Sequence, residues 1–146
     1  MTIQNEKNTT LLTHLSGFGG YIFPFGSVVI PLIIRETKKN ESKQIDKVSK
    51  DVINFNLSYL LYTFLLKLSI IPFFLGTFFQ NFRNYTSYDN WNFHFEYNSN
   101  HFFGFISIAS ILSIFAIIKV VLIIQAAIKA NKGEDYEYPF VIKFIK

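Results

Sequence analysis

The sequence predicts an all-α integral membrane protein, a small bundle of three transmembrane helices whose first helix is kinked or split. Three apolar runs, at 11–34, 52–80 and 102–128, lead to this prediction. At about 1.5 Å per residue each run is long enough to cross a hydrocarbon core of roughly 30 Å. A hydrophobic content of 50% with 18 Phe residues is high for a soluble domain. The 146 residues have room for one membrane domain.

Composition also excludes several classes of protein. The formal net charge is +4, and most basic residues flank the apolar runs, which favours contact with lipid headgroups over nucleic-acid binding. The chain has no cysteine, which excludes disulfides and thiolate metal sites. No small-residue cleavage site follows the first run, so we expect it to be retained and not removed as a signal peptide.

The first run, 11–34, follows a polar stretch at 1–10 and contains many helix breakers. These are Gly17, Gly19, Gly20, Pro24, Gly26 and Pro31. We favour a single kinked span, in which Gly17 and Gly20 allow close helix packing. The alternative is a re-entrant pair of half-helices, Leu11–Phe23 and Pro24–Ile34, each too short to cross alone.

The loop at 35–51 is strongly charged, yet Ile45, Val48 and Val52 recur in it at helical spacing. The second helix is therefore predicted to begin in water or at the interface, before the second run, 52–80, enters the membrane.

A loop rich in Asn and aromatic residues, at 81–101, separates the second and third runs and should lie at the headgroup layer. The third run, 102–128, is rich in Ile. Gly133 is a plausible stop for its helix, and the tail at 129–146 suits the membrane interface.

Lys and Arg residues set the expected topology. Six of them lie in 35–51 and four in 129–146, against one in 81–101. By the positive-inside rule the 35–51 loop and the C-terminus face the cytoplasm of a cytoplasmic (inner) membrane, and the aromatic loop faces out. A single kinked first span places the N-terminus outside, whereas the re-entrant pair places it inside.

One polar stripe is predicted within the second run. On a helix, Asn56, Tyr59, Thr63 and Lys67 share one face, which could line a path for a polar solute or bind a lipid phosphate. The simpler interpretation is that the stripe joins helices through hydrogen bonds while Lys67 snorkels or packs in the bundle. Lys119, in the third run, lies nearer the predicted cytoplasmic end and should snorkel more easily.

No motif indicates catalysis, a cofactor or a metal ion. The chain has no G-x-S-x-G, H-E-x-x-H or Gly-rich phosphate loop, so we expect no enzyme activity. His94, Glu96 and His101, with Asp89 nearby, form a conceivable metal set, but their spacing matches no established site. We expect His14 to be a packed or interfacial residue.

Several short fragments occur in a fixed order along the chain and contain His14, Pro24, Gly26, Pro31, Asn54, Lys129, Gly133, Tyr138 and Pro139. On these family-motif positions the chain resembles a bacterial membrane-protein family of unknown function that is similar to the chloroplast import component Tic-twenty (Tic-twenty-like). The resemblance covers roughly 11–80 and 102–146, and against it the loop at 81–101 is an insertion. It implies a channel or translocation subunit and supplies no catalytic residues.

The sequence therefore favours a non-enzymatic assembly or accessory subunit, with a channel or translocation subunit as the alternative and an enzyme or metal-site protein more distant. The expected partners are the lipid bilayer, anionic lipid at the cytoplasmic face, and a second copy or other membrane proteins. Neither nucleic acid nor a cofactor is expected.

Overall fold

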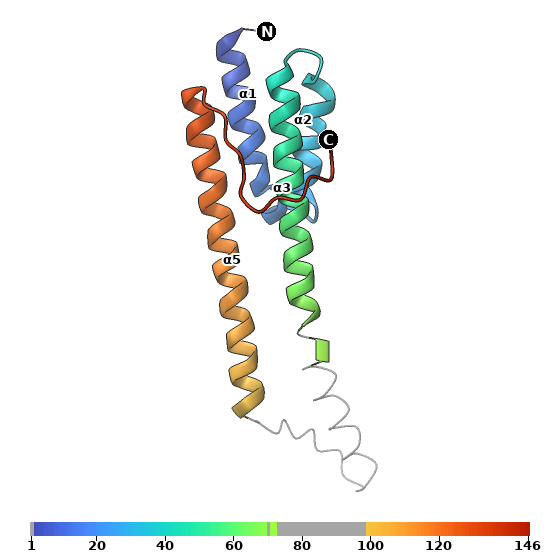
Figure 1. Cartoon of the computed structure of the whole chain (residues 1–146), viewed down its shortest axis with the longest axis vertical. Helices are drawn as coiled ribbons and strands as arrows, with labels where there is room; N and C mark the ends of the chain where they lie inside the picture. The colour runs from blue at the N-terminus through green and yellow to red at the C-terminus, as the bar shows by residue number, and fades with distance from the viewer. Residues whose placement is uncertain (1, 70, 73–98) are drawn as a thin grey trace, which may run out of the picture. The chain divides into compact units, whose positions relative to one another are not determined.

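The computed structural model describes residues 2–69, 71–72 and 99–146, with side chains at 99–102 and 105 excepted. Across these residues the chain is all-α, without strands (Figure 1). It divides into two compact units. The terminal unit comprises Met1–Leu61 and Ala116–Lys146, and the central unit comprises Tyr62–Phe115.

The first apolar run folds back on itself within the terminal unit. Helix α1 (Ile3–Leu15) begins after Thr2, whose side-chain oxygen accepts a hydrogen bond from the Asn5 amide. The 3₁₀-helix η1 (Ser16–Tyr21) continues it, and after a short turn α2 (Gly26–Lys38) returns toward the starting end (Figure 1). The first run is therefore split into two helical segments that fold back on each other, and the single kinked helix that we favoured is wrong.

Two glycines make this reversal possible. A Cβ on Gly26 would lie 2.2 Å from the Gly19 carbonyl oxygen, so the two backbones meet where no other residue fits. Phe25, just before α2, has a φ of 63°, in the left-handed region that reverses the chain direction. The helix of the first run is interrupted because Gly19 and Gly26 let its two segments pack against each other. A kink would have left one continuous helix.

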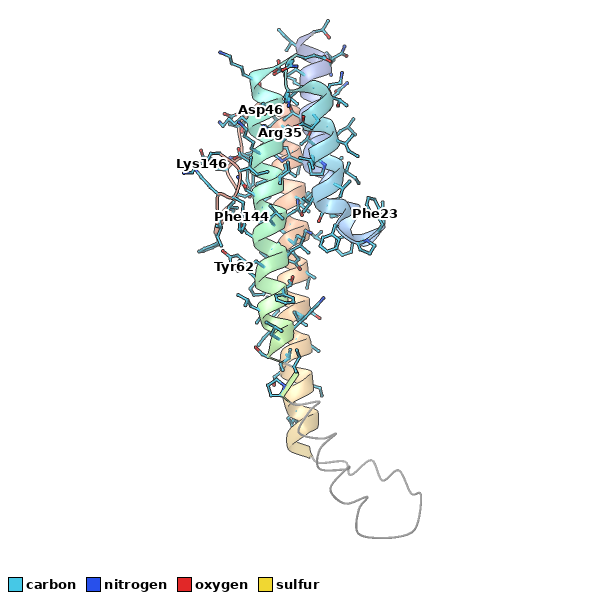
Figure 2. The ribbon with its side chains drawn as sticks, turned by 90° about the vertical axis from the view of Figure 1, so that its right-hand side faces the viewer. Phe23, Arg35, Asp46, Tyr62, Phe144 and Lys146 are labelled. Atoms are coloured by element: carbon cyan, nitrogen blue, oxygen red, sulfur yellow. The ribbon has the colours of Figure 1, made fainter. Side chains whose placement is uncertain are left out.

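Polar contacts join the open end of the α1–α2 pair to α3 (Lys43–Leu68). Arg35, near the end of α2, donates to Asp46 on α3 at 2.8 Å (Figure 2). The Ser42 hydroxyl, just before α3, donates to the Glu6 carboxylate on α1. The N-terminus and the α2–α3 connection therefore lie at the same end of the terminal unit (Figure 1). We call it the basic end because it includes the six Lys and Arg residues of 35–51.

Helix α3 confirms the predicted early start of the second helix. It begins within the charged loop, and Ile45, Val48 and Val52 are all buried. Within the described residues α3 ends at Leu68, and Ile71 and Pro72 are again helical. The rest of the second run, at 73–80, and the aromatic loop through residue 98 lie outside the described residues.

The longest helix, α5 (Ser99–Lys132), covers the third apolar run. It ends where predicted, because Gly133 adopts a φ of 80° and its amide donates to the Ala130 carbonyl. In the described part of the chain only Ile106–Lys132 is long and apolar enough to cross a membrane.

The terminal unit buries polar residues beside its apolar core and exposes many large apolar side chains, which a soluble domain rarely does. Its buried residues include Thr13, His14, Asn54, Asn56 and Lys119. Its exposed residues include Ile22, Phe25, Ile33, Ile117 and Ile128. Since hydrocarbon solvates apolar side chains, and polar side chains in lipid pair with one another inside the bundle, this distribution is typical of a membrane protein.

The contact between Gly19 and Gly26 leads to a first prediction. Gly26→Ala should destabilise the folded chain by about 1–3 kcal/mol, because the new methyl overlaps the Gly19 carbonyl and the backbone must shift. Thermal unfolding in detergent measures the loss. Gly20→Ala is the control, since its methyl would meet the movable Ser27 side chain at 3.1 Å. Equal losses in the two variants would contradict a special role for the Gly19–Gly26 contact.

Candidate functional site

The most densely connected polar site lies where α1, α3 and the C-terminal tail meet. His14 on α1 is 2% exposed, and its Nδ1 lies 2.9 Å from the Tyr138 hydroxyl oxygen in the tail. The Tyr138 ring stacks on Phe55 of α3 with centroids 4.1 Å apart. Burial, followed by nearby Tyr136 and Asp51, raises the pKa of Tyr138 far above its usual value. The hydroxyl therefore stays protonated and can donate to neutral His14.

Beyond Tyr138 the tail is fastened to α3 through its backbone. The side-chain Nδ2 of Asn54 donates to the backbone carbonyl of Ile145 at 2.9 Å, and its Oδ1 accepts from the backbone N–H of Ile145 at 2.8 Å. The Ser58 hydroxyl, one turn along α3, accepts from the Ile142 amide at 2.8 Å. These side chains satisfy backbone groups that a non-helical segment beside apolar surface would otherwise leave unpaired.

A lysine is buried at the midpoint of the apolar part of α5. Lys119 is 5% exposed, and its ammonium lies 4.5 Å from the Tyr59 ring centroid and 5.8 Å from that of Tyr21. Two aromatic faces compensate the cation through cation–π contacts. Tyr21 ends η1 and Tyr59 lies on α3. Lys119 of α5 therefore contacts both α3 and the turn of the α1–α2 pair. The expectation that Lys119 snorkels to the surface is not met.

The predicted stripe on α3 has members in different environments. Asn56 is fully buried and its amide donates to the Val52 carbonyl at 2.9 Å, whereas Lys67 is exposed. Tyr59 and Thr63 are half-buried. Asn56 and Tyr59 belong to the terminal unit, and Thr63 and Lys67 to the central unit. The stripe as a solute path or lipid site stays a prediction.

The two glycines proposed for helix packing lie inside the terminal unit. A Cβ on Gly17 would lie 3.0 Å from Ile123 of α5 and 3.4 Å from Asn56 of α3, and Gly20 faces Ser27 of α2. They bring helices of one chain together.

The residues that carried the family resemblance fall into three groups. His14, Asn54 and Tyr138 converge on the tail site just described. Turns and helix ends hold Pro24, Gly26, Gly133 and Pro139. Pro31 is buried within α2, and the Lys129 ammonium lies 5.6 Å from the Tyr136 ring centroid.

The conceivable metal set is not tested by the structure. Asp89, His94 and Glu96 lie outside the described residues, as does the side chain of His101. Among the residues that are described, no group of three or more His, Cys, Asp or Glu side chains could hold a metal ion.

The sequence analysis did not identify Phe55 or Ser58 as site residues, and it did not predict that the tail packs against α3. The available signal was the pair Asn54 and Ser58, one turn apart on the same face of the helix. Their partners are backbone groups 84 and 91 residues away, which no local pattern indicates.

One comparison with known proteins identifies the chain's relatives. The sequence model described as the magnetosome magnetite crystal formation protein family matches residues 5–145. No curated protein and no solved structure gives a significant match.

This match corrects two expectations and confirms one. The Tic-twenty-like resemblance is wrong, and the translocation role that it implied loses its support. The location is the magnetosome membrane and not the cytoplasmic membrane. Members of the matched family are non-enzymatic magnetosome membrane proteins, which confirms that the chain is not an enzyme.

The tail site leads to a second prediction. Tyr138→Phe should destabilise the protein by about 1–3 kcal/mol, because the ring still stacks on Phe55 while buried His14 loses its partner. Thermal unfolding measures the change. Tyr136→Phe removes only a 3.4 Å bond in an exposed setting and should change stability by less than about 0.5 kcal/mol. An equally mild effect in both variants would mean that the His14–Tyr138 contact contributes nothing.

Proposed function

We propose that this chain, which belongs to the magnetosome magnetite crystal formation protein family, is a non-enzymatic assembly subunit of the magnetosome membrane that associates with a second copy through the outer face of α5. The proposal includes crossing of the membrane by α5 and by the second apolar run, 52–80, whose first part lies in α3, with α1 and α2 as a re-entrant pair at the basic end. Its main support is a regular row of branched apolar side chains on α5.

This row, the α5 seam, consists of Ile117, Val121, Ile124 and Ile128. Steps of four, three and four residues place its members at alternating d and a positions of a heptad repeat. All four are between 45% and 63% exposed. The seam is thus a continuous apolar ridge that no described part of the chain covers.

The opposite side of α5 faces the bundle interior. Lys119, Ile123, Ala126 and Ala130 are all buried, and they lie roughly half a turn around the helix from the seam. The helix therefore packs one side against its own chain and leaves the other side to lipid or to a partner.

The seam fits another copy of itself. β-Branched residues at a and d positions pack as knobs into the holes of a facing helix. Val121 and Ile128 at the a positions favour helix pairs, whereas Ile117 and Ile124 at the d positions also suit three or four helices. In a two-fold symmetric pair each residue meets the same residue of the partner, so a single ridge suffices for both surfaces.

The interior supports the same conclusion by a different route. His14, Asn54 and Ser58 are occupied by the tail, and the Lys119 ammonium is covered by aromatic rings. These four polar residues thus hold the chain together. The surface remains for interaction with bilayer lipid, with another copy, and at the basic end with anionic headgroups.

Cysteine crosslinking tests the α5 seam. The natural chain has no cysteine, so single substitutions at Ile117, Val121, Ile124 and Ile128 can be oxidised in magnetosome membranes without background. We expect a disulfide-linked dimer at each seam position, because a symmetric pair brings identical residues together.

Ile118→Cys is the matched control, since Ile118 is 50% exposed but lies about 100° around the helix from Ile117. It should give several-fold less dimer. Absence of dimer at every seam position, or equal dimer at Ile118, would contradict association through α5.

A further inference from the structure

A cavity of about 160 Å³ lies at the basic end of the terminal unit, where α1, α3 and the end of α5 meet. It is lined by Ile3, Glu6, Lys7, Thr10, Gln44, Ala130 and Gly133. Three of these residues are polar side chains of α1, with Glu6 and Lys7 adjacent in sequence and Thr10 one turn further, so a single helix supplies most of the cavity's polar groups.

Thr10 differs from the threonines beside it. The hydroxyls of Thr9 and Thr13 donate to the carbonyls four residues earlier, Asn5 and Thr9, each at 2.8 Å. Thr10 is 3% exposed, and its hydroxyl makes no hydrogen bond within the described part of the chain. A buried hydroxyl without a partner costs about 1–3 kcal/mol. Because Thr10 lines the cavity, a rotation about its χ1 would let the hydroxyl bond to a ligand there and recover that loss.

The cavity carries both signs of charge. Glu6 and Lys7 line it as neighbours in sequence, and no ion pair joins them in the described structure. The Glu6 carboxylate accepts the Ser42 hydroxyl, and the Lys7 side chain runs past Gly133. A Cβ on Gly133 would lie 2.9 Å from Lys7 Cε, so the glycine leaves room for this lysine to reach the cavity.

These charges restrict the ligand. A simple anion would meet Glu6, and a simple cation would meet Lys7, each with a repulsive contact. A group that carries a phosphate and a primary ammonium satisfies both residues, and Thr10 and Gln44 add hydrogen-bonding groups beside it. Exposed Ile3 gives the cavity an apolar lip, suited to the glycerol and acyl part of a lipid.

We propose that this cavity binds a phosphoethanolamine group, with its phosphate at Lys7 and Thr10 and its ammonium at Glu6. A primary ammonium donates hydrogen bonds to the carboxylate, whereas a quaternary ammonium cannot, so the site distinguishes ethanolamine from choline headgroups. The same group is available from a membrane phospholipid or from a soluble phosphoethanolamine ester.

Calorimetric titration of the full-length protein in a phosphate-free maltoside detergent tests the chemistry. The probes are glycerophosphoethanolamine, glycerophosphocholine, inorganic phosphate and ethanolamine. Glycerophosphoethanolamine should bind at least about tenfold more tightly than the other three, since it alone pairs with both charges. Equal binding of phosphate or of glycerophosphocholine would overturn the assignment, as would no binding of glycerophosphoethanolamine.

Variants then locate the site. Lys7→Met and Glu6→Gln should each weaken glycerophosphoethanolamine binding about tenfold or more, and Thr10→Val several-fold, with Thr10→Ser restoring it. Thr9→Val is the matched control, because its hydroxyl bonds to the Asn5 carbonyl and does not line the cavity. Loss of binding in Thr9→Val equal to that in Thr10→Val would overturn the placement.

The source of the ligand is distinguished by native mass spectrometry from nanodiscs of mixed phosphatidylethanolamine and phosphatidylcholine. Selective retention of phosphatidylethanolamine, lost in Lys7→Met, would support a lipid ligand. Binding of the soluble ester without lipid retention would support a soluble one. Retention of both lipids in proportion to their abundance, unchanged by Lys7→Met, would contradict the site.

Discussion

The close contact between Gly19 and Gly26 is the constraint on which the terminal unit depends. It allows the first apolar run to reverse direction near its midpoint, so that α2 returns to the end from which α1 starts. From this follow the contact of Glu6 with Ser42, the Arg35–Asp46 ion pair, and the position of Tyr21 against Lys119. A larger residue at either glycine would separate the two backbones and with them these contacts.

The reversal also explains why polar residues are buried. The turn of the α1–α2 pair brings non-helical backbone and small polar residues into an apolar setting, where a polar group without a hydrogen bond costs free energy. The tail also has backbone groups that no helix pairs, since it follows α5 as irregular chain and runs beside α3. Asn54 and Ser58 form hydrogen bonds with these groups. The buried polar residues of the tail site are therefore structural, whereas the cavity at the basic end and the outer face of α5 are where this chain can act on others.

How much of this the sequence predicts depends on the range of each interaction. The all-α class, the early start of α3 and the end of α5 at Gly133 follow from local periodicity and a single stop residue, and all three are found. Whether 11–34 crosses or turns back depends on which glycines meet, and a kinked helix and a hairpin contain the same helix breakers. The sequence shows how far Lys119 lies from the end of its helix, and that distance predicted that it reaches the surface. Its burial beside Tyr21 is a tertiary contact, which the sequence does not show.

The family resemblance failed for a related reason. Motifs such as His14, Asn54 and Tyr138 mark a tail-binding arrangement, which is a property of the fold, and they do not by themselves name a function. The match over 5–145 supplies the magnetosome context that the individual motifs did not.

Labelling from one side of sealed magnetosome vesicles tests the central claim, that the first run turns back. Thr2→Cys, Asn40→Cys and Lys132→Cys place single thiols at the start of α1, between α2 and α3, and at the end of α5 in the cysteine-free chain. The re-entrant arrangement predicts that a membrane-impermeant maleimide labels all three from the same side. Labelling of Thr2→Cys only from the side opposite to the other two would show that the first run crosses the membrane, and would contradict the account.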